Sequence, residues 1–281
     1  MRIGVHVKRG NGLISSVRRA AELGCETIQV FAANPNAWHS PEIAPPVADE
    51  FRRTVEESDL RPVFVHTPYL VNLASPDPLI HSKSTAALAD SMIRAKLLGA
   101  NSVVTHIGSH KGAGMEQGIE RIRDAVSGVL DRADDDVILL LENSAGAGNS
   151  VGSKFEELRA ILDSLGGPDG RLGICLDTAH LWGAGYDVSD ADAVARTIAG
   201  FDSLVGIAWL RLVHLNDTRM GLGSRRDRHA NIGTGHIGES GFAAILHHPA
   251  LDPLAGIIET PANTIEDDAR DIAALKRLRQ G

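Results

Sequence analysis

The chain has 281 residues, 43% of them hydrophobic, and a formal net charge of −8. These values suit an ordinary globular chain with a sizeable core, and the negative charge excludes a wholly basic nucleic-acid-binding surface, though not a local one. No apolar run reaches membrane-spanning length and no signal-peptide pattern opens the chain, so we expect a cytoplasmic protein with no membrane partner.

Eight short segments rich in Val, Ile and Leu recur along the chain, and longer amphipathic segments separate them. The apolar segments have the composition of buried strands: IGVHV (3–7), TIQVF (27–31), PVFVH (62–66), SVVTH (102–106), VILLLE (137–142), LGICLD (172–177), LRLVH (210–214) and GIIE (256–259). Between them, apolar residues spaced three and four apart, often ending near glycine, predict helices over 12–24, 84–100, 118–133 and 153–166.

The alternation of strands and helices predicts a (β/α)8 TIM barrel, an α/β fold with residues 1–281 as a single domain. A doubly wound open sheet is the alternative fold, but no GxGxxG pattern follows the first strand. We expect long loops over residues 34–46 and 218–238. Cys25 and Cys175 lie in apolar surroundings without metal-binding spacing, which predicts reduced core residues.

The third to the eighth strand segments all end on a histidine or a carboxylate: His66, His106, Glu142, Asp177, His214 and Glu259. In a parallel barrel the C-terminal strand ends line one face, where the active site lies, so these side chains should converge. Imidazole and carboxylate are the usual donors for zinc, manganese or iron. A cation would also explain why Glu142 ends an apolar strand, because an unpaired buried charge is costly.

Loop residues extend this set of donors. His180 follows the sixth strand, and Asp227 and His229 lie in the loop after the seventh. Because positions i and i+2 of an extended segment face the same side, Asp227 and His229 can hold one ion while Arg228 points away. Nine candidate donors exceed the needs of one ion, so we expect two or three, with one carboxylate bridging a close pair.

Five stretches of the chain closely resemble the endonuclease IV family of apurinic/apyrimidinic (AP) endonucleases, which are trinuclear zinc enzymes on a TIM barrel. The stretches are HTPYLVNLA (66–74), THIGSH (105–110), ENSAGAG (142–148), GICLDTAH (173–180) and HLNDTRMGLGSRRDRH (214–229). The resemblance covers essentially the whole chain, and it depends on the five stretches together.

The resemblance implies three zinc ions held by His66, His106 and Glu142; by Glu142, Asp177, His214 and Glu259; and by His180, Asp227 and His229. Manganese or iron could replace zinc at one or more of these sites. Glu142 would bridge the first two ions, and Glu142 and Glu259 would be catalytic by holding the pair that activates the attacking water.

The implied activity belongs to base excision repair. It is hydrolysis of the phosphodiester 5′ to an abasic site in duplex DNA, which leaves a 3′-hydroxyl and a 5′-deoxyribose phosphate. Removal of blocking groups from 3′ ends would use the same centre. We expect a monomer that works on nucleoid DNA, because the barrel closes on its own and DNA must reach its open face.

Several residues are candidates for DNA contact. Tyr69 and Leu70 match two residues that family members insert through the minor groove. Asn36 stands where the best-known members have an inserting arginine, which shifts the expected damage recognition towards Tyr69 and Leu70. Arg225 and Arg228 belong to a basic stretch beside the donors and are predicted to contact phosphates.

Two other functions compete with this interpretation. A single-metal sugar isomerase or epimerase of the xylose-isomerase-like barrels would share the architecture, but it would not need His66, His106 or the third donor group. A non-catalytic DNA-binding barrel would have no reason to keep nine costly polar groups. His6 and His110 also face the barrel mouth, and their role is open between lining the pocket, contacting DNA and supporting the ligands.

Overall fold

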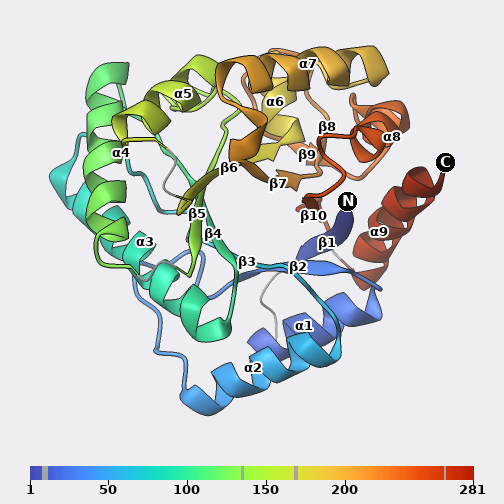
Figure 1. Cartoon of the computed structure of the whole chain (residues 1–281), viewed down its shortest axis with the longest axis horizontal. Coiled ribbons are helices and arrows are strands. Elements are labelled where there is room, and N and C mark those ends of the chain that lie inside the picture. The colour runs from blue at the N-terminus through green and yellow to red at the C-terminus, as the bar shows by residue number, and fades with distance from the viewer. Residues whose placement is uncertain (8–11, 134–135, 168–169, 263) are drawn as a thin grey trace.

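The computed structural model describes residues 1–7, 12–133, 136–167, 170–262 and 264–281. Within these residues, parallel strands close into an eight-stranded barrel with helices around its outside (Figure 1). The ladder runs in the order β1-β10-β7-β6-β5-β4-β3-β2, and β1 pairs with both β2 and β10. The predicted TIM barrel is therefore confirmed, and the open sheet is wrong because no strand edge is left free in this ladder.

The barrel strands agree with the predicted segments to within one residue at either end. They are β1 (Arg2–Val7), β2 (Thr27–Phe31), β3 (Val63–His66), β4 (Ser102–His106), β5 (Ile138–Glu142), β6 (Leu172–Asp177), β7 (Leu210–His214) and β10 (Ala255–Ile258). The helices are α1 (Leu13–Glu22), α2 (Pro45–Glu57), α3 (Pro78–Leu98), α4 (Met115–Leu130), α5 (Phe155–Ser164), α6 (Thr178–Ala184), α7 (Ala191–Leu204), α8 (Gly238–His247) and α9 (Ile265–Gln280), with a 3-10 turn over Ile207–Trp209.

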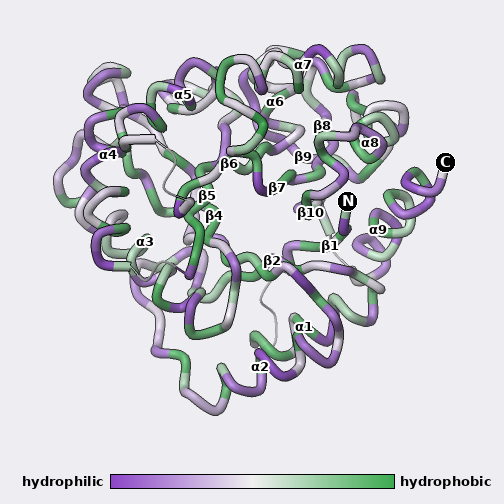
Figure 2. The backbone as a smooth tube through the Cα atoms, viewed as in Figure 1, coloured by the Kyte–Doolittle hydropathy of each residue, from purple (hydrophilic) through white to green (hydrophobic). Residues whose placement is uncertain are grey.

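Two apolar cores hold this architecture together. The larger one fills the space between the barrel and the helices, and the smaller one fills the barrel itself: Phe64, Val104, Leu140, Cys175, Leu212, Ala255 and Ile257. The hydropathy of the backbone follows the same division, since the barrel strands are largely apolar and the helices alternate (Figure 2). Burial of both faces is typical of parallel strands.

The inner core explains where the donors lie. Phe64, Val104, Leu140, Cys175, Leu212 and Ile257 each stand two residues before a predicted metal ligand. Residues i and i+2 of a strand point to the same side, so the ligands continue the inward-facing rows by one step towards the C-terminal mouth. The apolar plug below them closes the barrel, and the polar residues above it form the floor of the mouth.

The cysteine prediction is confirmed. Cys25 and Cys175 are buried and form no disulfide. Burial raises the pKa of each thiol to about 12, so both remain protonated at neutral pH.

The long loops differ in part from the prediction. The first ends earlier than expected, because Pro45 and Pro46 already belong to α2, whose first turn accepts proline well. In the second, β8 (Asp217–Thr218) and β9 (His229–Ala230) pair antiparallel, so the prediction of a plain loop over 218–238 is wrong. Two-residue strands are too short to leave a periodic signal in the sequence.

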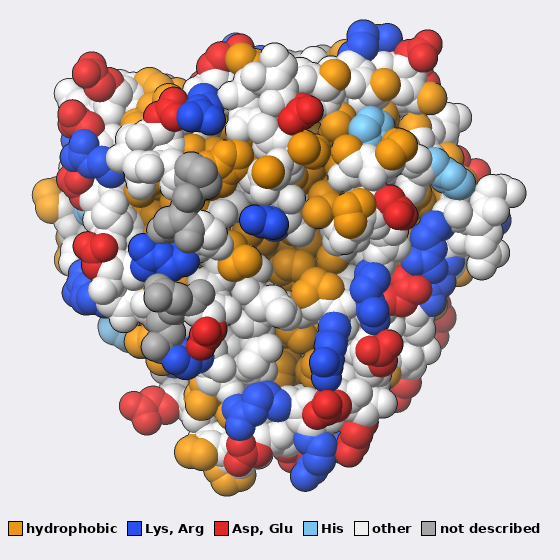
Figure 3. Space-filling view, viewed as in Figure 1, with side chains coloured by type: hydrophobic (Ala, Val, Ile, Leu, Met, Phe, Trp, Pro, Cys, Tyr) orange, Lys and Arg blue, Asp and Glu red, His pale blue; other side chains and the backbone are white. Residues whose placement is uncertain are grey.

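The outer surface of the described residues is mixed in charge. On the face seen in Figure 3, Lys and Arg side chains alternate with Asp and Glu around a central apolar area. Among the helices that the structure describes, none is both long and apolar enough to cross a membrane.

Candidate metal centre

The predicted donors meet at the C-terminal mouth of the barrel in three groups. Within each group the donor atoms lie within 4.8 Å of one another. The groups are His66, His106 and Glu142; Glu142, Asp177, His214 and Glu259; and Asp177, His180 and His229. The barrel thus brings together side chains that are far apart in the sequence, and two of the three groups share Glu142.

Glu142 lies at the centre of the cluster and is almost fully buried. Its Oε2 atom lies 3.2 Å from His66 Nε2 and 3.4 Å from His106 Nε2. Its Oε1 atom lies 3.3 Å from the Nδ1 atoms of His214 and His180. One oxygen therefore faces the first group and the other faces the second, which is the arrangement that a bridging carboxylate requires.

The third group differs from the predicted one in its carboxylate. The donor atoms that cluster with His180 and His229 include Asp177, whereas Asp227 was expected. Asp227 lies beside them all the same, with its carboxylate oxygens 3.2 Å from His180 Nε2 and 3.0 Å from His229 Nε2. The structure therefore places four donors around the third position, and Asp177 lies between the second and third groups.

Backbone carbonyl groups fix the ring orientation of three of the histidines. Nδ1 of His66, His180 and His229 lies 2.7, 2.8 and 3.2 Å from a backbone carbonyl oxygen. A carbonyl oxygen can only accept, so Nδ1 donates, and in the neutral ring that ligation requires the lone pair lies on Nε2, which faces the cluster. Buried His229 Nε2 has no hydrogen-bond partner, even though Asp227 Oδ1 is near. This pattern fits metal-ligating histidines.

The charges of the cluster are strongly coupled. Burial alone would raise the pKa of Glu142, but the surrounding histidines, His106 first, hold this pKa well below its usual range. Burial alone would lower the pKa of His229, but the carboxylates of Asp227 and Asp177 raise it to about 9. In the absence of a cation, Glu142 is therefore charged, and nearby carboxylates raise the pKa of His180, His214 and His229, which favours their protonated forms, whereas burial lowers the pKa of His106. A divalent cation would take the place of those protons, because ligation requires neutral histidine.

Two asparagines that were not predicted as site residues support the donors. Asn143 Oδ1 accepts a hydrogen bond from the backbone amide of Asp177 at 2.6 Å. Asn216 Nδ2 donates to Asp177 Oδ2 at 2.6 Å, and its Oδ1 accepts from the amide of Glu259 at 2.7 Å. Their position one or two residues after a ligand-bearing strand end was the signal that could have identified them.

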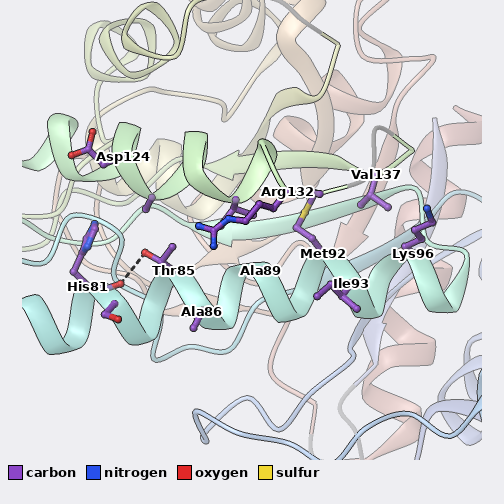
Figure 4. A pocket seen from close by; sticks show the side chains of 14 residues that line it. His81, Thr85, Ala86, Ala89, Met92, Ile93, Lys96, Asp124, Arg132 and Val137 are labelled. Carbon is purple, nitrogen blue, oxygen red and sulfur yellow. Dashed lines mark hydrogen bonds between the residues drawn. The ribbon is translucent and has the colours of Figure 1, made fainter.

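A cavity of about 310 Å³ opens beside the first and third groups. His106, Glu142, His180 and Asp227 line it, together with the loops that follow β4 and β5. A larger hollow, of about 670 Å³, lies between α3 and α4 on the outside of the barrel and contains none of the predicted site residues (Figure 4). The chemistry therefore belongs to the smaller cavity, which is where the titratable groups converge.

The predicted inserting residues lie around the same mouth. Tyr69 is 56% exposed and packs edge-on against Phe31 at a centroid distance of 5.1 Å. Leu70 is half-buried and Asn36 is exposed. The Tyr69 amide donates to the Pro35 carbonyl at 3.0 Å, so the loops after β2 and β3 are joined there.

The seventh loop carries the basic residues to the mouth. Arg225 and Arg228 are exposed, and Arg228 Nη1 donates to the backbone oxygen of Asp227 at 2.8 Å. The Arg225 amide donates to the Gly183 carbonyl of α6, the helix that also carries His180. His110 does not join the donors, because its Nδ1 accepts from the amides of Gly112 and Gly114 and so organises its own turn.

Comparison with known proteins supports one family. The chain matches the model of a xylose isomerase-like TIM barrel over residues 17–280. The probable endonuclease 4 of Methanoculleus marisnigri is 44% identical over 277 residues, which are 98% of each chain. The probable endonuclease 4 of Natranaerobius thermophilus is 41% identical over 99% of this chain and 98% of its own.

Solved structures agree with this result. Endonuclease IV from Thermus thermophilus superposes with a TM-score of 0.88 at 34% identity, and the match covers 100% of this chain and 99% of that one. A D-tagatose 3-epimerase-like protein superposes with a TM-score of 0.77 at 20% identity, over 100% of this chain and 97% of that one. At that identity the second likeness shows the barrel fold alone.

Proposed function

Because the chain belongs to the endonuclease IV family, we propose that it is an AP endonuclease that hydrolyses the phosphodiester 5′ to an abasic site in duplex DNA. The products would be a 3′-hydroxyl and a 5′-deoxyribose phosphate. The observation that carries the proposal is the triple donor cluster at the barrel mouth, in which both oxygens of Glu142 face different groups.

The donor set would hold three divalent cations, which we propose to be zinc. Glu142 would be shared by the first two ions and Glu259 would belong to the second. Asp227 and Asp177 both lie close enough to His180 and His229 to complete the third site. When bound, such ions make water nucleophilic near neutral pH and stabilise negative charge on a phosphate and on its leaving oxygen.

The protein side chains would position the substrate around this centre. The cavity of about 310 Å³ is at the lower end of the volumes of ligand pockets, which suits a sugar-phosphate unit without its base. Extrusion of a nucleotide costs least where the base is already missing. Tyr69 and Leu70 would fill the gap in the duplex, and Arg225 and Arg228 would contact phosphates along the backbone. Asn36 would lie beside the DNA without reaching into it as a long arginine does.

Blocked 3′ ends are a second proposed substrate of the same centre. A terminal phosphodiester presents the same phosphate to the same donors, so no additional group is needed. The protein would act as a monomer, because the barrel is closed without a partner and its open mouth must admit a duplex.

A single-metal sugar isomerase is supported only by the common fold. The likeness to the epimerase-like protein is at 20% identity, against 34% for the solved endonuclease. His66, His106 and the third group add donors that a one-ion site would leave idle.

The proposal is tested by metal content and cleavage together. Protein purified without chelator should hold about three zinc ions per chain, and it should cut a duplex with one abasic-site analogue on the 5′ side of the lesion. A duplex with a 3′-phosphoglycolate end should be trimmed by the same preparation. About one ion per chain, no cut and conversion of a ketose would instead support the sugar enzyme.

A further inference from the structure

We propose that Gln29 is a positioning residue for the second donor group, holding His214 and Glu259 in the orientation that presents them to a cation. Gln29 lies in β2, a strand that carries none of the predicted ligands, and it is completely buried. This inference rests on the proposed metal centre and concerns a residue that no donor pattern in the sequence indicates.

Gln29 reaches the cluster because of its register. It is the partner of His6 in the parallel pairing of β1 with β2, so both side chains face the same side of the sheet. His6 and Gln29 thus occupy the mouth on the two strands that supply no ligand. The polar floor of the mouth therefore has support from β1 and β2 and ligands from the other six strands.

The orientation of the Gln29 amide follows from its neighbours. One end of the amide lies 2.8 Å from Glu259 Oε1, and the other lies 3.0 Å from His214 Nε2. An ionised carboxylate can only accept, so the amide NH2 must face Glu259 and the amide oxygen must face His214. The reverse orientation would set the amide oxygen against the carboxylate oxygen.

This orientation determines the tautomer of His214. Since the Gln29 oxygen accepts, His214 Nε2 carries the hydrogen and its lone pair is on Nδ1. Nδ1 lies 3.3 Å from Glu142 Oε1, 3.3 Å from Glu259 Oε2 and 3.9 Å from Asp177 Oδ2. The nitrogen that faces the second group is therefore the one that can bind a cation.

Gln29 also makes the two oxygens of Glu259 differ in their contacts. Oε1 is held by Gln29 Nε2 at 2.8 Å and by His6 Nδ1 at 2.6 Å. Oε2 is left facing His214 Nδ1 and the second group. One buried amide thus orients both ligands in the folded protein. A cation that binds does not have to order these side chains, so its affinity is higher, as in other metal sites with supporting hydrogen bonds.

The test replaces Gln29 with an apolar side chain of similar size. Gln29→Leu removes the hydrogen bonds to Glu259 and His214, together with the contact of the amide nitrogen with His6 Nδ1 at 2.9 Å. Gln29→Met does the same with an unbranched side chain if the leucine variant folds poorly. Loss of such support lowers metal affinity by about 10- to 100-fold, so the variant should retain about one zinc ion fewer per chain against a competing chelator. Wild-type protein and variant are compared with zinc alone.

A second measurement separates positioning from simple packing. In protein labelled with 15N-histidine, the Nε2–H signal of His214 should be present in the wild type, with or without metal, and should shift and exchange faster in the variant. Thr27→Val is the matched control, because Thr27 is buried two residues earlier in β2 and its hydroxyl donates to the Pro62 carbonyl. This control should keep both the zinc content and the histidine signal.

The outcomes distinguish the two proposals. If wild-type protein holds three ions and both Gln29 variants bind them as tightly, with the His214 signal unchanged, the positioning role is wrong and the proposed function stands. If wild-type protein binds no zinc ions and does not cut DNA, the proposed function fails. The His214 Nε2–H signal, compared between wild type and the Gln29 variants, still decides whether Gln29 fixes the tautomer.

Discussion

At the residue scale, the cluster depends on the unequal burial of its members. Glu142 and His214 are almost fully enclosed, whereas the His106 side chain is 38% exposed and the Asp227 side chain 50% exposed. A buried carboxylate is tolerated only with compensating charge, so Glu142 has the least freedom of the set. The exposed members, His106 and Asp227, line the cavity of about 310 Å³ at the mouth.

Glu142→Gln preserves the size of the side chain and removes its charge. The first group loses its only anionic donor and the second loses one of its three carboxylates, so we expect at least one fewer ion per chain and a fall in cleavage of at least ~100-fold. Metal analysis and steady-state kinetics would measure both effects. Glu239→Gln, at a surface ion pair with Arg277, is the control and should change neither. Full activity of the Glu142 variant would contradict the bridging role.

Tyr69 should contribute to DNA binding through its aromatic ring and not through its hydroxyl. Burial and the negative charges of Glu259 and Glu142 raise its pKa to about 12, so the hydroxyl is neutral at physiological pH. Tyr69→Ala should weaken binding to a duplex with an abasic-site analogue by about 1–3 kcal/mol, the usual value of an aromatic stacking contact, and Tyr69→Phe should bind nearly as the wild type does.

Equilibrium titration at fixed salt measures this effect. Leu79→Ala is the control, because Leu79 is a comparably exposed apolar residue on α3. Equal affinity of Tyr69→Ala and the wild type would show that the ring does not contact the DNA.

At the scale of elements, the seventh loop is held by one buried carboxylate. Asp217 accepts hydrogen bonds from the backbone amides of Thr218, Gly235, Ile237 and Gly238. A Cβ atom on Gly235 would lie 2.3 Å from Asp217 Oδ1, so only glycine permits this approach. The β8–β9 hairpin and this anchor together carry Asp227 and His229 to the mouth.

The same loop should set the salt dependence of DNA binding. Arg225→Gln and Arg228→Gln should each reduce the slope of log K against log salt concentration by about 0.9 if each arginine neutralises one phosphate. Affinity is measured at several salt concentrations with intact and abasic duplexes. Arg123→Gln, on α4 beside Asp124, should leave the slope unchanged. An unchanged slope in both loop variants would remove these residues from the DNA interface.

At the scale of the whole molecule, the N-terminal strand β1 pairs with the last barrel strand, β10, and closes the barrel. The C-terminal helix α9 lies beside β1 (Figure 1). Glu26 accepts hydrogen bonds from the amide of Ile3 in β1 and from both terminal nitrogens of Arg279 in α9. Arg279 also donates to the carbonyl of Met1. The first two strands and the last helix, α9, are therefore joined at the base of β2.

This junction should make stability depend on pH. Burial opposes ionisation of Glu26, but Arg279 and the Ile3 amide lower its pKa below the usual 4.5. Because the folded pKa is the lower one, the stabilisation is present above the unfolded pKa and is lost as pH falls through the folded value. Glu26→Gln should lower the free energy of unfolding at pH 7 by about 1 kcal/mol or less, and by a smaller amount below pH 4.

Urea unfolding at both pH values would measure this difference. Glu57→Gln, which breaks only the ion pair with Arg53 within α2, is the matched control. A difference between Glu26→Gln and the wild type that is the same at both pH values would contradict the linkage.

The sequence by itself determined the strands and the ligands that they carry. Alternation within a strand decides which side chains face inward, and this pattern is local, so Phe64 followed by His66, or Leu140 followed by Glu142, could be identified without a fold. The barrel followed from the count and order of the elements. The loop residues His180, Asp227 and His229 followed from their positions after the sixth and seventh strands, and the motif resemblance then assigned them to one ion.

Only the tertiary structure decided how these residues are grouped. Asp177 joins His180 and His229 because barrel closure and the packing of the seventh loop on α6 set distances between remote segments, and no periodicity records those distances. Gln29 is polar in an apolar strand, yet its role appears only when β2 lies near His214 and Glu259. Local pattern fixes the side of a strand on which a residue lies, whereas its partners depend on register and closure.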